Sequence, residues 1–189
     1  MLSINVNEET VLKELGLDSA RDLFNLICSN RNYLRQWLTW VDETKHIDDT
    51  INYIQSTSDG DMFCGRYVME IRHRDSLAGI IDFHNGDKIN MIIEIGYWLA
   101  EKFQGKGIMT ECCRSCINYA FANLGFNRVV IKCAIANERS KAIPERLHFT
   151  FEGIEREGQN LNGEYTDLMV FSMLKKDWTG YGKISNSIL

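Results

Sequence analysis

The stretch EIGYWLAEKFQGKGIMTE, residues 94–111, sets how the rest of the sequence is interpreted. In its first half every second residue is apolar, with Ile95, Tyr97 and Leu99 on one side, and this alternation indicates a strand. Residues 104–107, QGKG, form a glycine-rich turn, and an apolar pattern with helical spacing follows at once. The first N–H groups of a helix have no partner within it and carry partial positive charge, so such a turn can bind a phosphate. The alternative is that the glycines only allow the tight change of chain direction between strand and helix and bind nothing.

Two familiar phosphate-binding motifs do not fit this turn. A P-loop requires Ser or Thr after its lysine, whereas Lys106 is followed by Gly107. The dinucleotide fingerprint GxGxxG requires a third glycine, and residues 108–110 are Ile, Met and Thr. If the turn binds an anion, it therefore belongs to another family of sites.

The composition is that of an ordinary globular chain. The 189 residues include 44% hydrophobic and 25% charged residues, which suits one domain over residues 1–180 with a flexible tail at 181–189. The net charge of −5 argues against nucleic acid as a partner. The sequence shows neither a signal peptide nor an apolar run long enough to cross a membrane. We therefore expect a cytoplasmic protein.

The six cysteines do not suggest a metal site. Cys112, Cys113 and Cys116 follow the apolar spacing of the helix after the glycine turn, and the other three are scattered. No histidine lies near them in sequence to complete a set of ligands. We expect these cysteines to fill space in the core, and we expect no bound metal.

Hydrophobic periodicity predicts a mixed sheet with helices packed on it. The expected strands are 3–15, 62–72, 76–84, 89–99, 128–136, 149–157 and 165–174, and the expected helices begin near Asp18 or Ser19, near Asp48 or Asp49, at about 106 and at about 138. Gly125 is expected to end the third helix. Asn85-Gly86 and Asn162-Gly163 are predicted hairpin turns.

Residues 30–41, NRNYLRQWLTWV, allow two interpretations. Tyr33, Trp37 and Trp40 are spaced as the buried stripe of a helix, and this is the interpretation we favour. The two tryptophans, with Arg31 and Arg35 just before them in the same segment, also suit the wall of a substrate cleft.

A second motif gives a family resemblance. Strand 128–136 ends in NERS, residues 137–140, and the next helix continues KAIPERLHF to Phe149. With QGKGIM upstream, this resembles the (Q/R)xxGx(G/A) and NxxS…E(K/R)xGF motifs of the GCN5-related N-acetyltransferases (GNAT). NRxxLxxWLxWVD, EIGYWL and the terminal LKKDW narrow the resemblance to the subgroup that acetylates the N-terminal serine of a ribosomal stalk protein. Met109 and His148 depart from the glycine or alanine found at those motif positions.

The resemblance implies a fold and a cosubstrate. The expected fold is α/β, with a mixed, mostly antiparallel central sheet that is splayed between its fourth and fifth strands and flanked by helices. The expected cosubstrate is acetyl-CoA, with its pyrophosphate on the turn and its pantetheine beside the preceding strand. The expected contacts are Tyr97, Trp98, Leu99, Gln104, Gly105, Lys106, Gly107, Ile108, Met109, Thr110 and Asn137.

Acetyl transfer to an amine requires a neutral amine and a proton for the departing thiolate. Ser140 is our candidate proton donor, and its alternative role is to cap a helix. Glu94 is our candidate base, and its alternative role is that of a cross-strand carboxylate. An α-amino group with a pKa near 7.7–8.0 is partly neutral at pH 7, so a weak base suffices.

We therefore expect an acetyl-CoA-dependent N-acetyltransferase that acts on the amino terminus of a protein, with Arg31, Arg35, Trp37 and Trp40 at the acceptor site. The alternatives are an enzyme that acetylates a small amine and a non-catalytic module that binds acyl-CoA. A homodimer is left open.

Overall fold

The computed structural model describes residues 2–58 and 65–180. Its strands form one eight-stranded sheet in the order β1-β2-β3-β4-β5-β6-β8-β7. All neighbouring strands are antiparallel except β5 and β6, which are parallel. The strands are β1 Ser3–Asn7, β2 Thr10–Glu14, β3 Tyr67–His73, β4 Ser76–Asp87, β5 Ile92–Leu99, β6 Arg128–Ala134, β7 Thr150–Leu161 and β8 Glu164–Leu174. The predicted mixed α/β class is confirmed.

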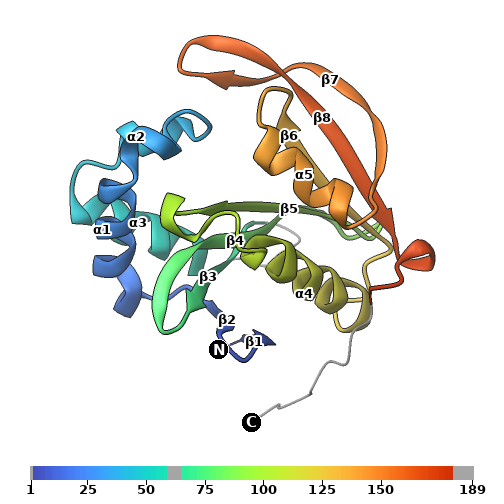
Figure 1. Cartoon of the computed structure of the whole chain (residues 1–189), viewed down its shortest axis with the longest axis horizontal. Helices are drawn as coiled ribbons and strands as arrows, with labels where there is room; N and C mark the ends of the chain where they lie inside the picture. Colours follow the sequence, from blue (N-terminus) through green and yellow to red (C-terminus); the bar gives the residue numbers. More distant parts are fainter. Residues whose placement is uncertain (1, 59–64, 181–189) are drawn as a thin grey trace.

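The sheet opens between β5 and β6. The two strands pair only where Ile92–Glu94 lies beside Arg128–Val130. Beyond Glu94 they separate, and Figure 1 shows the β6–β8 part of the sheet turning away from β5. These are the fourth and fifth strands of the sequence prediction, so the predicted splay is confirmed. The count differs because residues 3–15 form the hairpin β1–β2 rather than one strand.

Helices cover the sheet and complete the core. They are α1 Ala20–Ser29, α2 Arg31–Leu34, α3 Ile47–Ser58, α4 Ile108–Ala122 and α5 Glu138–Arg146. Cys112, Cys113 and Cys116 on α4 are fully buried, in agreement with their predicted place in the core. None of the helices within residues 2–58 and 65–180 is long and apolar enough to cross a membrane. In the same residues, no cluster of His, Cys, Asp or Glu is arranged to hold a metal ion.

The two Asn-Gly pairs behave differently. Asn162-Gly163 joins β7 to β8 with φ of 54° and 98°, as predicted for a two-residue turn. Asn85-Gly86 lies inside β4 and forms an irregularity in its pairing with β5 instead. The chain reverses after Asp87, whose carboxylate accepts the N–H groups of residues 89 and 90 at 2.9 and 2.8 Å. The prediction that Asn85-Gly86 is the turn is therefore wrong, because the strand continues to Asp87, whose carboxylate holds the loop of residues 88–91 instead.

The favoured interpretation of residues 30–41 is also wrong. The helix α2 stops at Leu34, and a short 3-10 helix, Thr39–Asp42, follows after Leu38 adopts an extended conformation. This break leaves Trp37 half-buried and Trp40 36% exposed, so neither belongs to a buried stripe. The predicted tail at 181–189 and the start of the strand expected at 62–72 lie outside the described residues.

Candidate active site

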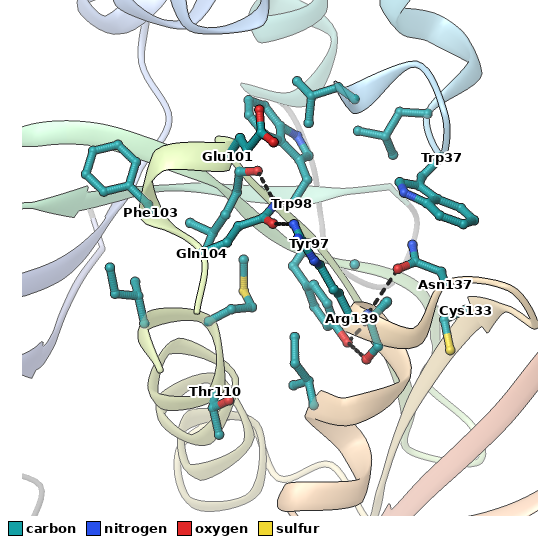
Figure 2. Close-up of a pocket in the computed structure, with 18 of the residues that line it drawn as sticks. Trp37, Tyr97, Trp98, Glu101, Phe103, Gln104, Thr110, Cys133, Asn137 and Arg139 are labelled. Carbon is teal, nitrogen blue, oxygen red and sulfur yellow. Dashed lines mark hydrogen bonds between the residues drawn. The ribbon is translucent and has the colours of Figure 1, made fainter. Parts of the chain in front are cut away.

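A cavity of about 820 Å³ occupies the opening between β5 and β6. The end of β5, the turn at 104–107, the start of α4, the end of β6 and the start of α5 all contribute to its lining, and so do residues after α1 and one residue of β7. The splay thus brings together the two sequence motifs, which are about thirty residues apart in the chain. Figure 2 shows side chains of both motifs facing this space.

The glycine turn is shaped for an anion. Gly105 and Gly107 have φ of 72° and 77°, a conformation that favours glycine. A side-chain carbon at either position would meet no atom within 4 Å, so both backbones face open space. The N–H groups of Ile108, Met109 and Thr110 begin α4 and have no acceptor within the helix. Together with the helix dipole, these groups could hold a phosphate or pyrophosphate.

The opposite wall is held by a small hydrogen-bonded group. Asn137 caps α5, because its side-chain oxygen accepts the N–H of Ser140 at 3.1 Å. The Tyr97 hydroxyl donates to the Ser140 carbonyl at 3.1 Å and lies 3.4 Å from the Ser140 hydroxyl (Figure 2). The capping role considered for Ser140 therefore belongs to Asn137. Ser140 presents its hydroxyl toward β5.

Burial keeps the neighbouring acidic groups neutral. Burial raises the pKa of Tyr97 well above its usual value, so its phenol stays protonated near neutral pH. Burial also raises the pKa of the Cys133 thiol, at the end of β6, to about 11. This end of the cavity therefore offers two hydroxyl groups and a thiol, all of them protonated.

Two contacts within the cavity had no signal in the sequence. Arg139 donates to the side-chain oxygen of Gln104, which joins the start of α5 to the glycine turn (Figure 2). The side chain of Gln159, on β7, donates to the Trp37 carbonyl at 3.5 Å. Arg139 lies inside a motif that the sequence analysis quoted, whereas nothing local marks Gln159.

Most of the predicted cosubstrate and site residues line this cavity. They are Trp37, Tyr97, Trp98, Leu99, Gln104, Gly105, Gly107, Ile108, Met109, Thr110, Asn137 and Ser140. The residues that line this cavity do not include Arg31, Arg35, Trp40, Glu94 or Lys106. The Lys106 ammonium instead lies 5.8 Å from the centre of the Phe103 ring.

The three acceptor-site residues outside this cavity have other contacts. Arg31 donates to the carbonyls of Val41 and Thr44, which folds the segment back on itself. Arg35 is exposed and forms an ion pair with Asp42 at 2.7 Å. Trp40 packs against Trp98, with ring centres 6.2 Å apart. Of the four residues predicted to bind the acceptor, only Trp37 faces the cavity.

Glu94 lies in a row of charges across the sheet. Its carboxylate is 3.3 Å from Nε2 of His84 and 3.9 Å from the Lys132 ammonium. Burial raises the pKa of Glu94, but the hydrogen bond and charge of His84, with help from Asn85 and Lys132, lower it below its usual value. Lys132 also pairs with Glu155 on β7 at 2.9 Å. The structure therefore places Glu94 in the cross-strand position that the sequence analysis named as its alternative.

Comparisons with known proteins agree with this geometry. The model of the GNAT acetyltransferase domain matches residues 10–150. The putative ribosomal N-acetyltransferase YdaF of Bacillus subtilis is 38% identical over 183 residues, which cover 95% of this chain and 99% of the relative. The structure of the ribosomal L7/L12 α-N-protein acetyltransferase RimL with coenzyme A is similar, with a TM-score of 0.87, 28% identity, and coverage of 92% of this chain and 98% of that one. The microcin C7 self-immunity acetyltransferase MccE, solved with acetyl-CoA and AMP, has a TM-score of 0.85 and 30% identity, and the match covers 89% of this chain and 94% of that one.

Proposed function

The chain belongs to the GNAT acetyltransferase family, and from that premise we propose that it transfers the acetyl group of acetyl-CoA to the α-amino group at the amino terminus of a protein. The expected acceptor is a ribosomal protein, as in the names of YdaF and RimL. The observation that carries the proposal is the cavity in the splay, which has an anion site at one end and protonated hydroxyl groups at the other.

The described residues fit acetyl-CoA along the length of the cavity. The N–H groups at the start of α4 suit the pyrophosphate. Beyond Glu94 the edge of β5 that faces β6 pairs with no strand within residues 2–58 and 65–180, so Tyr97–Leu99 can pair with the amide groups of the pantetheine as an added strand would. The side-chain oxygen of Asn137 is used in capping α5, which leaves its NH₂ group for the pantetheine.

The residues at the far end suit release of the thiol. The bound thioester supplies the acetyl group, and transfer to an amine leaves a thiolate that must gain a proton. We propose that the Ser140 hydroxyl donates this proton and that the Tyr97 hydroxyl, 3.4 Å away, orients it. The role of Glu94 as the base that takes up the proton of the amine stays a prediction.

The rim of the cavity supports an extended acceptor. The Arg35 carbonyl accepts a hydrogen bond from the Asn162 side chain at 2.9 Å, and the Trp37 carbonyl accepts one from Gln159. The segment after α2 thus meets the β7–β8 hairpin, and the two together form one wall of the cavity, along which we propose that an extended chain lies. Trp37 provides a rigid apolar wall there.

A small-molecule acceptor is the second candidate. The similarity to MccE, which is named for microcin immunity, is as strong as that to RimL. The family and the fold therefore do not distinguish a protein amino terminus from a small molecule as the acceptor. A cytoplasmic location and a homodimer also stay predictions.

An acceptor screen tests the proposal. Thiol release from acetyl-CoA is measured with a serine-starting peptide, the same peptide already acetylated at its amino terminus, spermidine and free lysine. We expect fast release with the first peptide alone. Release only with spermidine or lysine would favour a small-amine enzyme, and release with none of them would favour a module that only binds acyl-CoA.

A further inference from the structure

A second cavity, of about 580 Å³, adjoins the first. Both are lined by Leu38, Gly96, Tyr97 and Trp98, so they meet along the last residues of β5. The remaining walls of the second cavity come from α1, α3, β4 and the residues around Trp40. A molecule held in this cavity therefore lies next to the one that holds the cosubstrate.

The second cavity attracts cations. Its described lining carries the carboxylates of Glu43, Asp49 and Asp82, opposed by the guanidinium of Arg66. Asp49 is already engaged, because it accepts the N–H groups of residues 45 and 46 at 2.9 and 2.8 Å. Glu43 is exposed, whereas the side chain of Asp82 is only 9% exposed. Asp82 is thus the buried carboxylate that faces the junction of the two cavities.

The Asp82 carboxylate is held from one side. Its Oδ1 lies 2.7 Å from Nδ1 of His84 and 3.3 Å from Nε of Arg66. A side-chain carbon at residue 96 would lie 3.2 Å from Oδ2, 3.3 Å from Oδ1 and 2.9 Å from Cε1 of His84. Because residue 96 is glycine, the carboxylate and the edge of the His84 ring both face the strand shared by the two cavities. The contacts of Oδ1 with His84 and Arg66 therefore orient the carboxylate at the junction.

A second observation also indicates a polar occupant. Thr50 lines the same cavity, is 2% exposed, and its hydroxyl has no hydrogen-bond partner in residues 2–58 and 65–180. A buried hydroxyl without a partner is costly, and most buried polar groups in folded proteins are satisfied. A polar ligand in the cavity would supply that partner.

We propose that the second cavity receives the amino group of the acceptor and that Asp82 contacts it, with His84 as the positioning residue that holds the Asp82 carboxylate. This inference rests on the proposed function and specifies its acceptor as a primary amine that arrives as a cation, such as a protein α-ammonium. The carboxylate accepts an N–H hydrogen bond from the ammonium and from the neutral amine alike. The contact therefore persists when the amine loses the proton that blocks its attack on the thioester.

The test separates recognition of the amino group from acetyl transfer. Binding of a short serine-starting peptide is compared by calorimetry with binding of its des-amino analogue, both with coenzyme A at saturation so that no acetyl group is transferred. We expect the wild type to prefer the amino peptide and Asp82→Asn to lose about 10–100-fold in affinity for that peptide alone, the range for a hydrogen bond to a charged group. Coenzyme A should bind with unchanged affinity. In rate measurements with acetyl-CoA, His84→Gln should raise KM for the peptide more than it lowers kcat.

Two further variants keep the result interpretable. Asp75→Asn makes the same change on the exposed β3–β4 turn and should behave as the wild type. If Asp82→Asn does not fold, Gly96→Ala places a carbon 3.2 and 3.3 Å from the two Asp82 oxygens and 2.9 Å from Cε1 of His84, so the pair is covered and must shift, and the preference for the amino peptide should be lost. A folded Asp82→Asn or Gly96→Ala protein that keeps the wild-type preference would overturn the inference. The proposed function fails separately, if the wild type transfers acetyl to no amine.

Discussion

His84 should make the stability of this protein depend on pH in the neutral range. Its ring contacts Asp82 at 2.7 Å and Glu94 at 3.3 Å, and its side chain is 16% exposed. Burial by itself lowers the pKa of His84, but the hydrogen bonds and charges of the two carboxylates outweigh it and raise that pKa to about 9. Arg66 and Lys132 complete the row of charges on either side.

The sign and size of the effect follow from linkage. The pKa of His84 is higher in the folded state than its value near 6.5 in the unfolded chain, so its stabilisation is fully present below pH 6.5 and is lost as the pH rises through 9. At about 1.4 kcal/mol per unit of pKa, this stabilisation amounts to about 3 kcal/mol. About 2 kcal/mol of it is lost between pH 6 and pH 8.5. For a chain of this length, that loss lowers Tm by about 4–8 °C.

The assay is thermal unfolding at pH 6, 7, 8 and 8.5. Toward the top of this range the thiols of the unfolded chain also begin to ionise, while burial raises the pKa of Cys112 to about 12, so cysteine adds its own alkaline loss of stability to the wild type and the variant alike. His84→Gln should lower Tm at pH 6 and flatten the profile, so that the difference between the variant and the wild type shrinks to about 1 kcal/mol by pH 8.5. His46→Gln, at an exposed position just before α3, is the matched control and should keep the wild-type profile. A wild-type Tm that does not change with pH, or a His84→Gln profile parallel to it, would refute this reasoning.

Three further predictions concern the cosubstrate and acceptor sites. Gly107→Val places a branched side chain at φ 77°, toward the anion site, and should weaken acetyl-CoA binding in calorimetry while the fold survives. Unchanged affinity in a folded variant would mean that the turn only connects β5 to α4 and does not bind the cosubstrate. Ser140→Ala should lower turnover by about 10²–10⁴-fold with little change in acetyl-CoA binding, and a fall of less than about threefold would leave the serine without the role of proton donor. Trp37→Ala and Arg35→Ala should raise KM for a serine-starting peptide, provided that melting shows each variant folded; wild-type KM in both would remove the local support for a protein terminus as acceptor.

The sequence predicted the parts of the fold that depend on local pattern. The alternation in residues 89–99, the glycine turn and the apolar spacing after it indicated β5, the turn at 104–107 and α4, because each signal lies within a few residues. The cavity between β5 and β6 came from the resemblance rather than from the pattern. Its lining includes most of the residues expected to hold the cosubstrate.

The contacts that the sequence did not reveal depend on strand register and on where a helix stops. His84 meets Glu94 because the two are opposite each other on β4 and β5, and the irregularity after His84 hid that register. Arg139 reaches Gln104 across the splay. Trp37 faces the cavity because the chain leaves the helix at Leu34, and the spacing of aromatic residues gave no sign of that break.

The most direct test of acetyl transfer to an α-amino group is to locate the acetyl group itself. A peptide that begins with serine and contains one internal lysine is incubated with the protein and acetyl-CoA, and the product is fragmented by mass spectrometry. We predict one acetyl group, on the α-amino group of the serine. Acetylation of the lysine alone, or no acetylated product, would contradict the proposed function.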